Sequence, residues 1–528
     1  MQPGHHPSHG VAYQPSGVSQ YIMQDTQEGM EWRQAEPVPL TKAEAGLQIA
    51  RPSRPWRMYG RVVGLVVLAY FFTQLVASGL IIGLEGSPYF GALCIGISLP
   101  FMLGLVAMRR PRIILLERAL PDPGGQYIHP IASHAGSLRT PMPTRMGRHL
   151  IRDDSVLDVP SSGRSWLLFT FVVLCALGLG ILTALNPAFY VIALPLIIPT
   201  ILVGFSIPVM AWWSHSTKRI GLPTRRRDAE AWLMAGILCG IPAILINSWI
   251  FPNIALGILP NLSDDGLLFA MVTISAPVGE EICKGLAVFY FADRIRSPRH
   301  GFQVGFTVGL GFAIVENLQY IVQSSGGGIG FSLTMLVRGI GSIPGHAFWT
   351  GLTGVGLGWM LMRNRAAALH RAAVAGQRIA PPKAEETDWK LFDTKTGLEI
   401  DPAGKAPQGS VSVSPSGVRI WTPAPITDPA KAWFRLPLPK HPLVGLMFAI
   451  LGHGIWNGSS VGIELWALAN GLDILGQILL SLVWTGFLVL MVLLIGSGLL
   501  GGVREAPDGS ELEAYRSNLA TLTSQLSE

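Results

Sequence analysis

The chain has 528 residues, of which 49% are hydrophobic and only 14% are charged, and its mean hydropathy is +0.41. Soluble domains carry about 25% charged residues. The composition therefore excludes an ordinary soluble protein and predicts an all-α polytopic membrane protein. The formal net charge of +6 does not indicate a nucleic-acid partner, because the Arg and Lys residues gather in particular loops, where they report topology.

Residues 1–58 are predicted to be a disordered cytoplasmic tail, since the first fifty are rich in Gln, His, Pro, Gly and Ser and poor in apolar residues. About ten runs that follow are long and apolar enough to span a bilayer. They lie near residues 60–83, 88–108, 166–186, 188–213, 231–252, 267–292, 302–322, 331–362, 443–463 and 472–497.

The loops between these runs alternate in charge. Clusters of Arg and Lys precede the first run and follow the second, fourth, sixth, eighth and tenth, whereas the opposite loops carry almost none. Because positive charge marks the cytoplasmic side, we expect an even number of spans with both termini in the cytoplasm and a location in the plasma (cell) membrane.

Two of the cytoplasmic loops are large. Residues 109–165 are rich in Pro, Gly and Arg and are expected to lack a core of their own, whereas 363–442 fits either a small β-rich subdomain or an irregular loop. The whole chain then divides as follows: tail 1–58, two spans 59–108, loop 109–165, three spans 166–252, first core part 253–362, loop 363–442, second core part 443–498 and cytoplasmic tail 499–528.

Ionisable residues interrupt the apolar runs of the second half. Glu280 and Glu281 lie in the sixth run with Lys284, one helical turn later, as its only other charge. Each ionised side chain at the bilayer centre costs roughly 2.5–3.5 kcal/mol on insertion scales. Such groups persist where they face a protein interior or a water-filled cavity, so a functional site is expected here. The structural alternative is a buried ion pair that fixes helix packing.

The polar residues of four successive runs share one depth. Glu316 with Asn317 lies in the seventh run, His346 in the eighth, and His453 with Asn457 in the ninth. At 1.5 Å per residue, these residues and the glutamate pair lie about 15–22 Å from an end of their run. We therefore expect spans six to nine to form a catalytic core around them.

The residue types indicate hydrolytic chemistry. Two adjacent carboxylates in low dielectric share a proton or hold a cation, and one of them can act as a general base toward water. Imidazole can bind zinc or assist an oxyanion. Zinc is permitted by these donors, but no His-Glu-x-x-His motif is present, so a metal-independent glutamate mechanism stays open.

The eighth run is too long for a straight crossing. It contains Gly339, Gly341 and Pro344, which predict a kink or break just before His346. Arg338 lies in the same stretch, and two interpretations of it are open: it reaches the outer interface or it pairs with a carboxylate.

At these positions the chain resembles the PrsW family of intramembrane proteases, which is related to the CAAX-processing endopeptidases. The resemblance rests on Glu280-Glu281-Ile-Cys-Lys284, on Phe312-Ala-Ile-Val-Glu316-Asn317, on the following His346 and on His453-Gly-Ile-Trp-Asn457. It covers roughly 230–360 and 440–500.

The resemblance implies an endopeptidase that cuts a membrane-associated protein, such as a regulatory or anti-sigma-type protein, within or beside the lipid bilayer. It implies that Glu280 or Glu281 activates water and that His346 assists. His453 and Asn457 would stabilise the oxyanion, whereas Glu316 stands where CAAX-type relatives carry a histidine. The predicted catalytic residues are Glu280, Glu281, Glu316, His346, His453 and Asn457; the predicted zinc ligands are Glu281, His346 and His453; and the predicted supporting residues are Lys284, Phe312 and Asn317.

The rival function is proton-coupled transport, since carriers also place carboxylates and histidines in mid-membrane. Carriers often show an internal repeat with broken helices in matching positions. The polar residues here all lie in the second half of the chain, which favours an enzyme core with an N-terminal helical extension.

Overall fold

The structure is a computed structural model that divides into two units, residues 1–47 with 112–153 and residues 48–111 with 154–528. It describes residues 22–25, 30–33, 40–41, 55–111, 113–131, 136–152, 157–222, 224–326, 328–377, 379–380, 391–392, 399–400, 411–413, 419–421 and 434–525. Most of the predicted N-terminal tail and much of the loop 363–442 lie outside these residues.

The first unit is built on a long antiparallel hairpin. Strand β4 (Ile113–Ile131) pairs with β5 (Gly136–Arg152), and the register is irregular between Pro121 and Ile128. The short β3 (Leu40–Thr41) lies parallel to β5, and β1 (Ile22–Asp25) pairs with β2 (Met30–Arg33). The sequence prediction for 109–165 did not include this hairpin, because its Pro and Gly content is typical of a loop.

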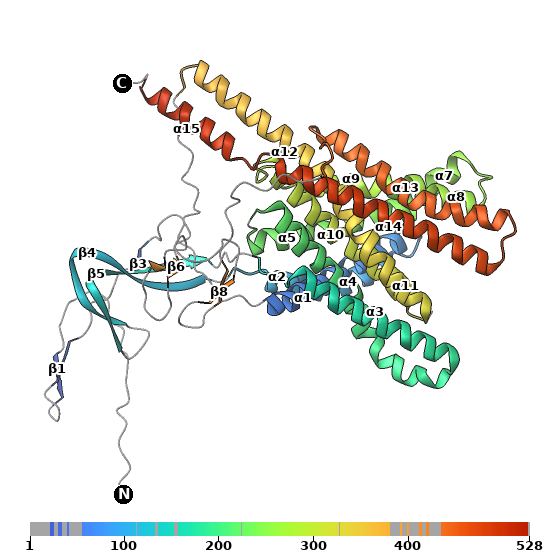
Figure 1. Cartoon of the computed structure of the whole chain (residues 1–528), viewed down its shortest axis with the longest axis horizontal. Coiled ribbons are helices and arrows are strands. Elements are labelled where there is room, and N and C mark those ends of the chain that lie inside the picture. The colour runs from blue at the N-terminus through green and yellow to red at the C-terminus, as the bar shows by residue number, and fades with distance from the viewer. Residues whose placement is uncertain are drawn as a thin grey trace, which may run out of the picture. The chain divides into compact units, whose positions relative to one another are not determined.

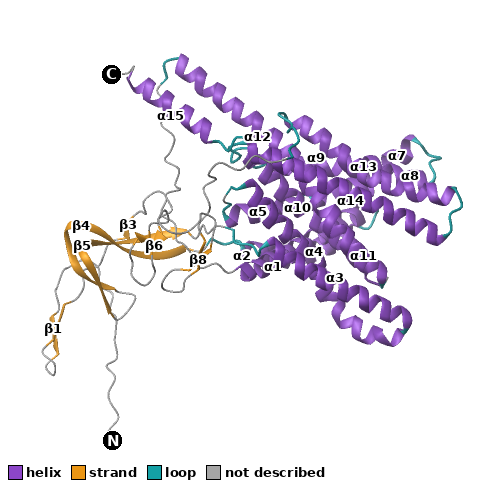
Figure 2. Ribbon diagram, in the orientation of Figure 1, coloured by secondary structure: helices purple, strands orange, loops and turns teal. Residues whose placement is uncertain are grey.

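The second unit is helical, as Figure 2 shows, apart from two short strand pairs. The pairs are β6 (Leu391–Phe392) with β7 (Glu399–Ile400) and β8 (Val411–Val413) with β9 (Arg419–Trp421). The helices are α1 (Pro55–Leu84), α2 (Pro88–Met108), α3 (Ser162–Leu185), α4 (Tyr190–Ile220), α5 (Arg226–Leu238), α6 (Gly240–Leu245), α7 (Phe251–Ile258), α8 (Asp264–Ala270), α9 (Ala276–Phe289), α10 (Pro298–Gln323), α11 (Ile329–Val337), α12 (Ile343–Val374), α13 (Pro442–Ala469), α14 (Ile474–Glu505) and α15 (Ser510–Gln525).

Each of the ten predicted spans coincides with helix. Among the described residues, 8 helical segments are long and apolar enough to cross a membrane, which confirms an all-α polytopic membrane protein. The other two predicted spans, α11 with α12 and α13, are long helices outside that set. Both carry glycines and polar residues of the predicted site.

Three of the helices contain a π-helical segment. These segments are η2 (Ile246–Ile250) between α6 and α7, η3 (Met271–Ser275) between α8 and α9, and η5 (Arg338–Ser342) between α11 and α12. The predicted break before His346 therefore takes the form of a π segment. π segments inside α-helices are frequent at functional sites. These three lie next to the polar residues that share one depth, which supports a functional site there.

Helix α10 runs inside the helical bundle (Figure 1), and 83% of its most apolar window is buried. It approaches α12 very closely through Gly301, Gly305 and Gly309. A Cβ at these positions would lie 2.2, 2.5 and 2.3 Å from backbone carbonyl oxygens of α12. Small residues allow membrane helices to pack backbone against backbone, and this contact sets the separation of the polar residues that α10 and α12 carry.

Candidate functional site

The glutamate pair lies in α9, immediately after the π segment η3, and both carboxylates are buried. Glu281 is 1% exposed and Glu280 is 7% exposed. Glu281 Oε1 accepts from the ammonium group of Lys284, one turn later, and Thr350 Oγ1 of α12 donates to Glu281 Oε2 over 3.4 Å. Lys284 is fully buried, so this ion pair is shielded from solvent.

His453 of α13 reaches the same carboxylate. Its Nδ1 lies 3.1 Å from Glu281 Oε1. Because a carboxylate can only accept, Nδ1 carries the hydrogen and Nε2 carries the lone pair. Asn457, one turn along α13, donates to that Nε2 over 3.1 Å.

His346 of α12 forms a second histidine–carboxylate pair. Its Nε2 lies 2.5 Å from Glu316 Oε2 of α10, and its Nδ1 accepts from Lys284 Nζ over 3.0 Å. Glu316 also accepts from Arg338 Nη1 of η5 over 3.0 Å. Because an ammonium group can only donate, Nδ1 is the nitrogen of His346 with the lone pair.

Glu280 differs from the other two glutamates. Its Oε1 accepts from Asn247 Nδ2 of η2 over 3.1 Å, and Ser275 Oγ of η3 donates to Asn247 Oδ1 over 3.0 Å. Its Oε2 is buried without a hydrogen-bond partner among the described residues. The nearest groups are His453 Nε2 at 3.8 Å and Lys284 Nζ at 3.9 Å.

Aromatic rings enclose the cluster. Trp349 stacks on His453 with ring centroids 4.9 Å apart and planes at 14°, and the centroids of Trp349 and His346 are 5.4 Å apart with planes at 75°. Phe312 places its ring 4.3 Å from Lys284 Nζ and 5.5 Å from the His346 ring. These rings lower the local dielectric constant and strengthen the electrostatic interactions inside the cluster.

Glu280, His346 and His453 each offer one ligand atom, and these atoms lie within 4.8 Å of one another. One carboxylate with two imidazoles is a donor set of catalytic zinc sites. The donor types fit a divalent metal ion. To bind it, the two imidazole lone pairs would release the hydrogen bonds that they accept from Lys284 Nζ and Asn457 Nδ2, whereas Glu280 Oε2 has no hydrogen-bond partner among the described residues. The predicted ligand set held Glu281 in place of Glu280; in the structure, Glu281 instead holds Lys284 and orients His453.

The structure brings together all six predicted catalytic residues, with Lys284 and Phe312 beside them. Asn317 is not part of this cluster, since its Nδ2 donates to Ala313 O of its own helix over 2.6 Å. Of the two interpretations of Arg338, pairing with a carboxylate is the one observed. Asn247 and Ser275 were missed; the signal for Asn247 is an amide within an otherwise apolar run.

The helices and this cluster define an integral membrane protein with a buried site of carboxylates and imidazoles, a class that includes intramembrane hydrolases and ion carriers. Comparison with protein families separates the two. Residues 229–381 match the PrsW family intramembrane metalloprotease. The chain thus carries a PrsW-family domain and is a protease, and transport is not favoured.

The matched segment contains Glu280, Glu281, Glu316 and His346 but ends before α13. His453 and Asn457 are therefore joined to the family domain by the contacts described above. Neither the curated proteins nor the solved structures contain a match to this chain.

Proposed function

We propose that the chain hydrolyses a peptide bond of a membrane-anchored protein at the cluster formed by α9, α10, α12 and α13, and that the three glutamates have different roles. The observation that carries this proposal is the pairing of each histidine with its own carboxylate. Glu281 accepts from Nδ1–H of His453, and Glu316 Oε2 forms an ion-pair contact with Nε2 of His346. Glu280 is left with a free oxygen beside them.

This pattern is the one that orients histidines as metal ligands. A metal-bound histidine typically donates its other N–H to a carboxylate or carbonyl group, which fixes the ring and its tautomer. Glu280, His346 and His453 would hold the ion, and zinc is the ion we propose because the donor set matches its catalytic sites. Bound zinc would polarise the scissile carbonyl group and lower the pKa of water.

Without a metal ion, the side chains themselves support the reaction. Water adds to the peptide carbonyl carbon and its proton passes to a carboxylate, for which the free oxygen of Glu280 is placed. The C–N bond then breaks, and that proton moves to the departing amine. Asn457 Nδ2 and Lys284 Nζ are donors beside the two histidines and can stabilise the negative oxygen of the tetrahedral intermediate.

The substrate that fits an intramembrane site is a membrane-anchored protein, and a regulatory or anti-sigma-type protein is the class that we propose. We also propose that the protein lies in the plasma membrane with both termini in the cytoplasm. The support for this orientation is the alternation of basic and uncharged loops along the chain.

Cleavage of a membrane-anchored peptide by the protein reconstituted in liposomes tests the function. We expect Glu280→Gln and His346→Ala to abolish cleavage. Matched controls are Glu464→Gln and His370→Ala, because these exposed residues lie on α13 and α12, away from the cluster. Full activity of both site variants would refute the proposal.

Metal dependence is measured separately, by elemental analysis of the purified protein and by chelation followed by addition of zinc. Two results together support the metal-dependent mechanism. The purified protein contains zinc that Glu280→Gln lacks, and added zinc restores the activity of the chelated protein. Full activity of metal-free protein would assign the reaction to Glu280 alone.

A further inference from the structure

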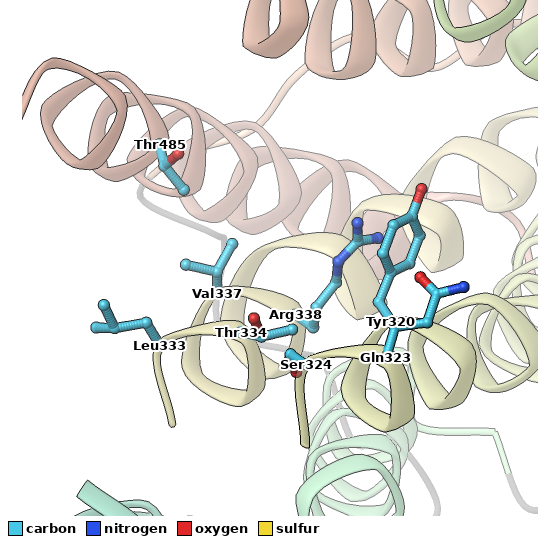
Figure 3. A pocket seen from close by; sticks show the side chains of 8 residues that line it. All are labelled: Tyr320, Gln323, Ser324, Leu333, Thr334, Val337, Arg338 and Thr485. Atoms are coloured by element: carbon cyan, nitrogen blue, oxygen red, sulfur yellow. The ribbon is translucent and has the colours of Figure 1, made fainter. Parts of the chain in front are cut away.

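An open pocket lies beside the site, between the C-terminal end of α10, the helix formed by α11 and η5, and α14 (Figure 3). Its volume is about 480 Å³. Six of its 8 lining residues are polar, and they include the hydroxyl groups of Tyr320, Thr334 and Thr485 and the amide of Gln323. Arg338 is the one charged residue among them.

Arg338 connects this pocket to the site. Its Nη1 donates to Glu316 Oε1 over 3.0 Å, and the other oxygen of Glu316 lies 2.5 Å from His346 Nε2. The guanidinium lies over the Tyr320 ring at 3.5 Å, and 19% of the Arg338 side chain is exposed. A single carboxylate therefore separates the cation of the pocket from a histidine of the site.

The guanidinium has donors for a second acceptor. It carries five N–H donors, and its hydrogen bonds to Glu316 and to Ser342 both use Nη1. No acidic residue lines the pocket. A charged side chain in a membrane-spanning region requires water or a polar partner, and Arg binds planar carboxylates with paired hydrogen bonds.

The position of Arg338 along its helix distinguishes two sources of an anionic ligand, a lipid headgroup and a side chain of a peptide substrate. Arg338 is nine residues after the start of α11 at Ile329, which is about 13 Å along the helix. Lipid headgroups lie outside the hydrocarbon core that such helices cross. A peptide chain that enters the site, by contrast, must pass close to Glu316 and His346.

We propose that this pocket is a subsite that receives an acidic side chain of the substrate near the scissile bond, and that Arg338 is its specificity-determining residue. The proposal rests on the proposed proteolytic function for its biological meaning. The binding itself can be measured without any cleavage.

The test measures binding of fluorescent transmembrane peptides to the full chain in nanodiscs. The peptides share one apolar host sequence and carry a single Asp, or the isosteric Asn, at successive positions. Hydrogen bonds to charged groups contribute roughly 1.5–3 kcal/mol, so we expect the Asp peptide to bind about tenfold tighter or better at one position.

Thr334→Asp is the decisive variant, since residue 334 is one turn before Arg338 and its carboxylate would pair with the guanidinium at i,i+4. It leaves Glu316 in place and should remove the preference for Asp while the Asn peptide binds as before. Thr334→Asn is the matched control and should keep the preference. Equal binding of Asp and Asn peptides at every position, or a preference that survives Thr334→Asp, would overturn the subsite. Cleavage of the bound peptides reports on the protease function independently.

Discussion

Lys284 is the buried counter-ion of Glu280 and Glu281, and replacing it with Met should destabilise the protein strongly. The side chain is fully buried, its ammonium group donates to Glu281, and it lies 3.9 Å from Glu280 Oε2. With an effective dielectric constant of about 20, a contact near 4 Å is worth about 4 kcal/mol. Removing one partner of a buried ion pair typically costs about 3–5 kcal/mol.

We therefore expect Lys284→Met to lower the free energy of unfolding by about 3–5 kcal/mol. The assay is denaturant unfolding in detergent micelles followed by tryptophan fluorescence. The double variant Lys284→Met with Glu281→Gln should recover most of the loss, because it leaves no unpaired charge at Glu281 and Gln can still accept from His453. Lys440→Met is the control: Lys440 is exposed, so its replacement should change stability by less than about 1 kcal/mol.

Two results would refute this reasoning. If Lys284→Met unfolds within about 1 kcal/mol of the unchanged protein, the ion pair does not stabilise the bundle. If the double variant is as unstable as the single variant, the loss comes from the missing side-chain packing and not from the uncompensated carboxylate.

Two further predictions concern the residues around the site. Asn247→Ala removes the donor to Glu280 Oε1 and should weaken zinc binding about 10–100-fold in a competition titration. The control is Asn253→Ala, an exposed residue of the next helix, which should leave the zinc affinity unchanged. Equal zinc affinities of the two variants would contradict the role of Asn247. Gly309→Ala places a Cβ 2.3 Å from a carbonyl oxygen of α12 and should lower thermal stability by about 1–3 kcal/mol. Gly178→Ala, with nothing within 4 Å of its Cβ, should leave stability unchanged or slightly higher, and an equal loss in both would argue against close α10–α12 packing.

The spans and the depth of the site could be predicted because both depend on local composition. An apolar run of sufficient length has few alternatives to a membrane helix. The glutamates and histidines stand out within such runs, because burying an ionisable group in a membrane requires partners. The coincidence of Glu281, His346 and His453 in space follows from their shared depth, which counting along each helix provides.

The supporting residues were harder to predict because their contacts are not local. Asn247 lies 33 positions before Glu280, and the π segment η2 carries it. A π segment inserts one residue into a helical turn and changes which face the following side chains occupy. Hydrophobic periodicity does not reveal such insertions. The hydrogen bond from Asn247 to Glu280 and the ion pair between Arg338 and Glu316 could therefore not be derived from residue spacing.

The hairpin β4–β5 shows a different limit. Its residues Ile113 to Leu116 are apolar without alternation, and prolines and glycines follow. Strand prediction relies on period-two patterns between turn signals. Long pairing between β4 and β5 is a tertiary outcome, with partners as far apart as Ile113 and Arg152, and composition alone favoured a loop.

The three glutamates show why roles need distances as well as motifs. In sequence, Glu280 and Glu281 are equivalent neighbours, and Glu316 departs from the histidine of the related CAAX-type enzymes. In the structure, Glu281 accepts from one histidine, and Glu316 forms ion-pair contacts with the other histidine and with Arg338. Glu280 Oε2 is buried without a hydrogen bond among the described residues, and its ion-pair contacts are longer, at 3.8 and 3.9 Å.

Their charges lead to the same assignment. Three carboxylates face two permanent cations, Lys284 and Arg338, which leaves one negative charge in excess while both histidines are neutral. A buried uncompensated charge is strongly unfavourable, so a proton or a cation must join the cluster. Glu280 is the carboxylate with an oxygen available for either one. A variant that lacks this carboxylate, Glu280→Gln, should therefore lose bound metal without losing the two histidine–carboxylate pairs, and a loss of metal in Glu281→Gln alone would reverse the two roles.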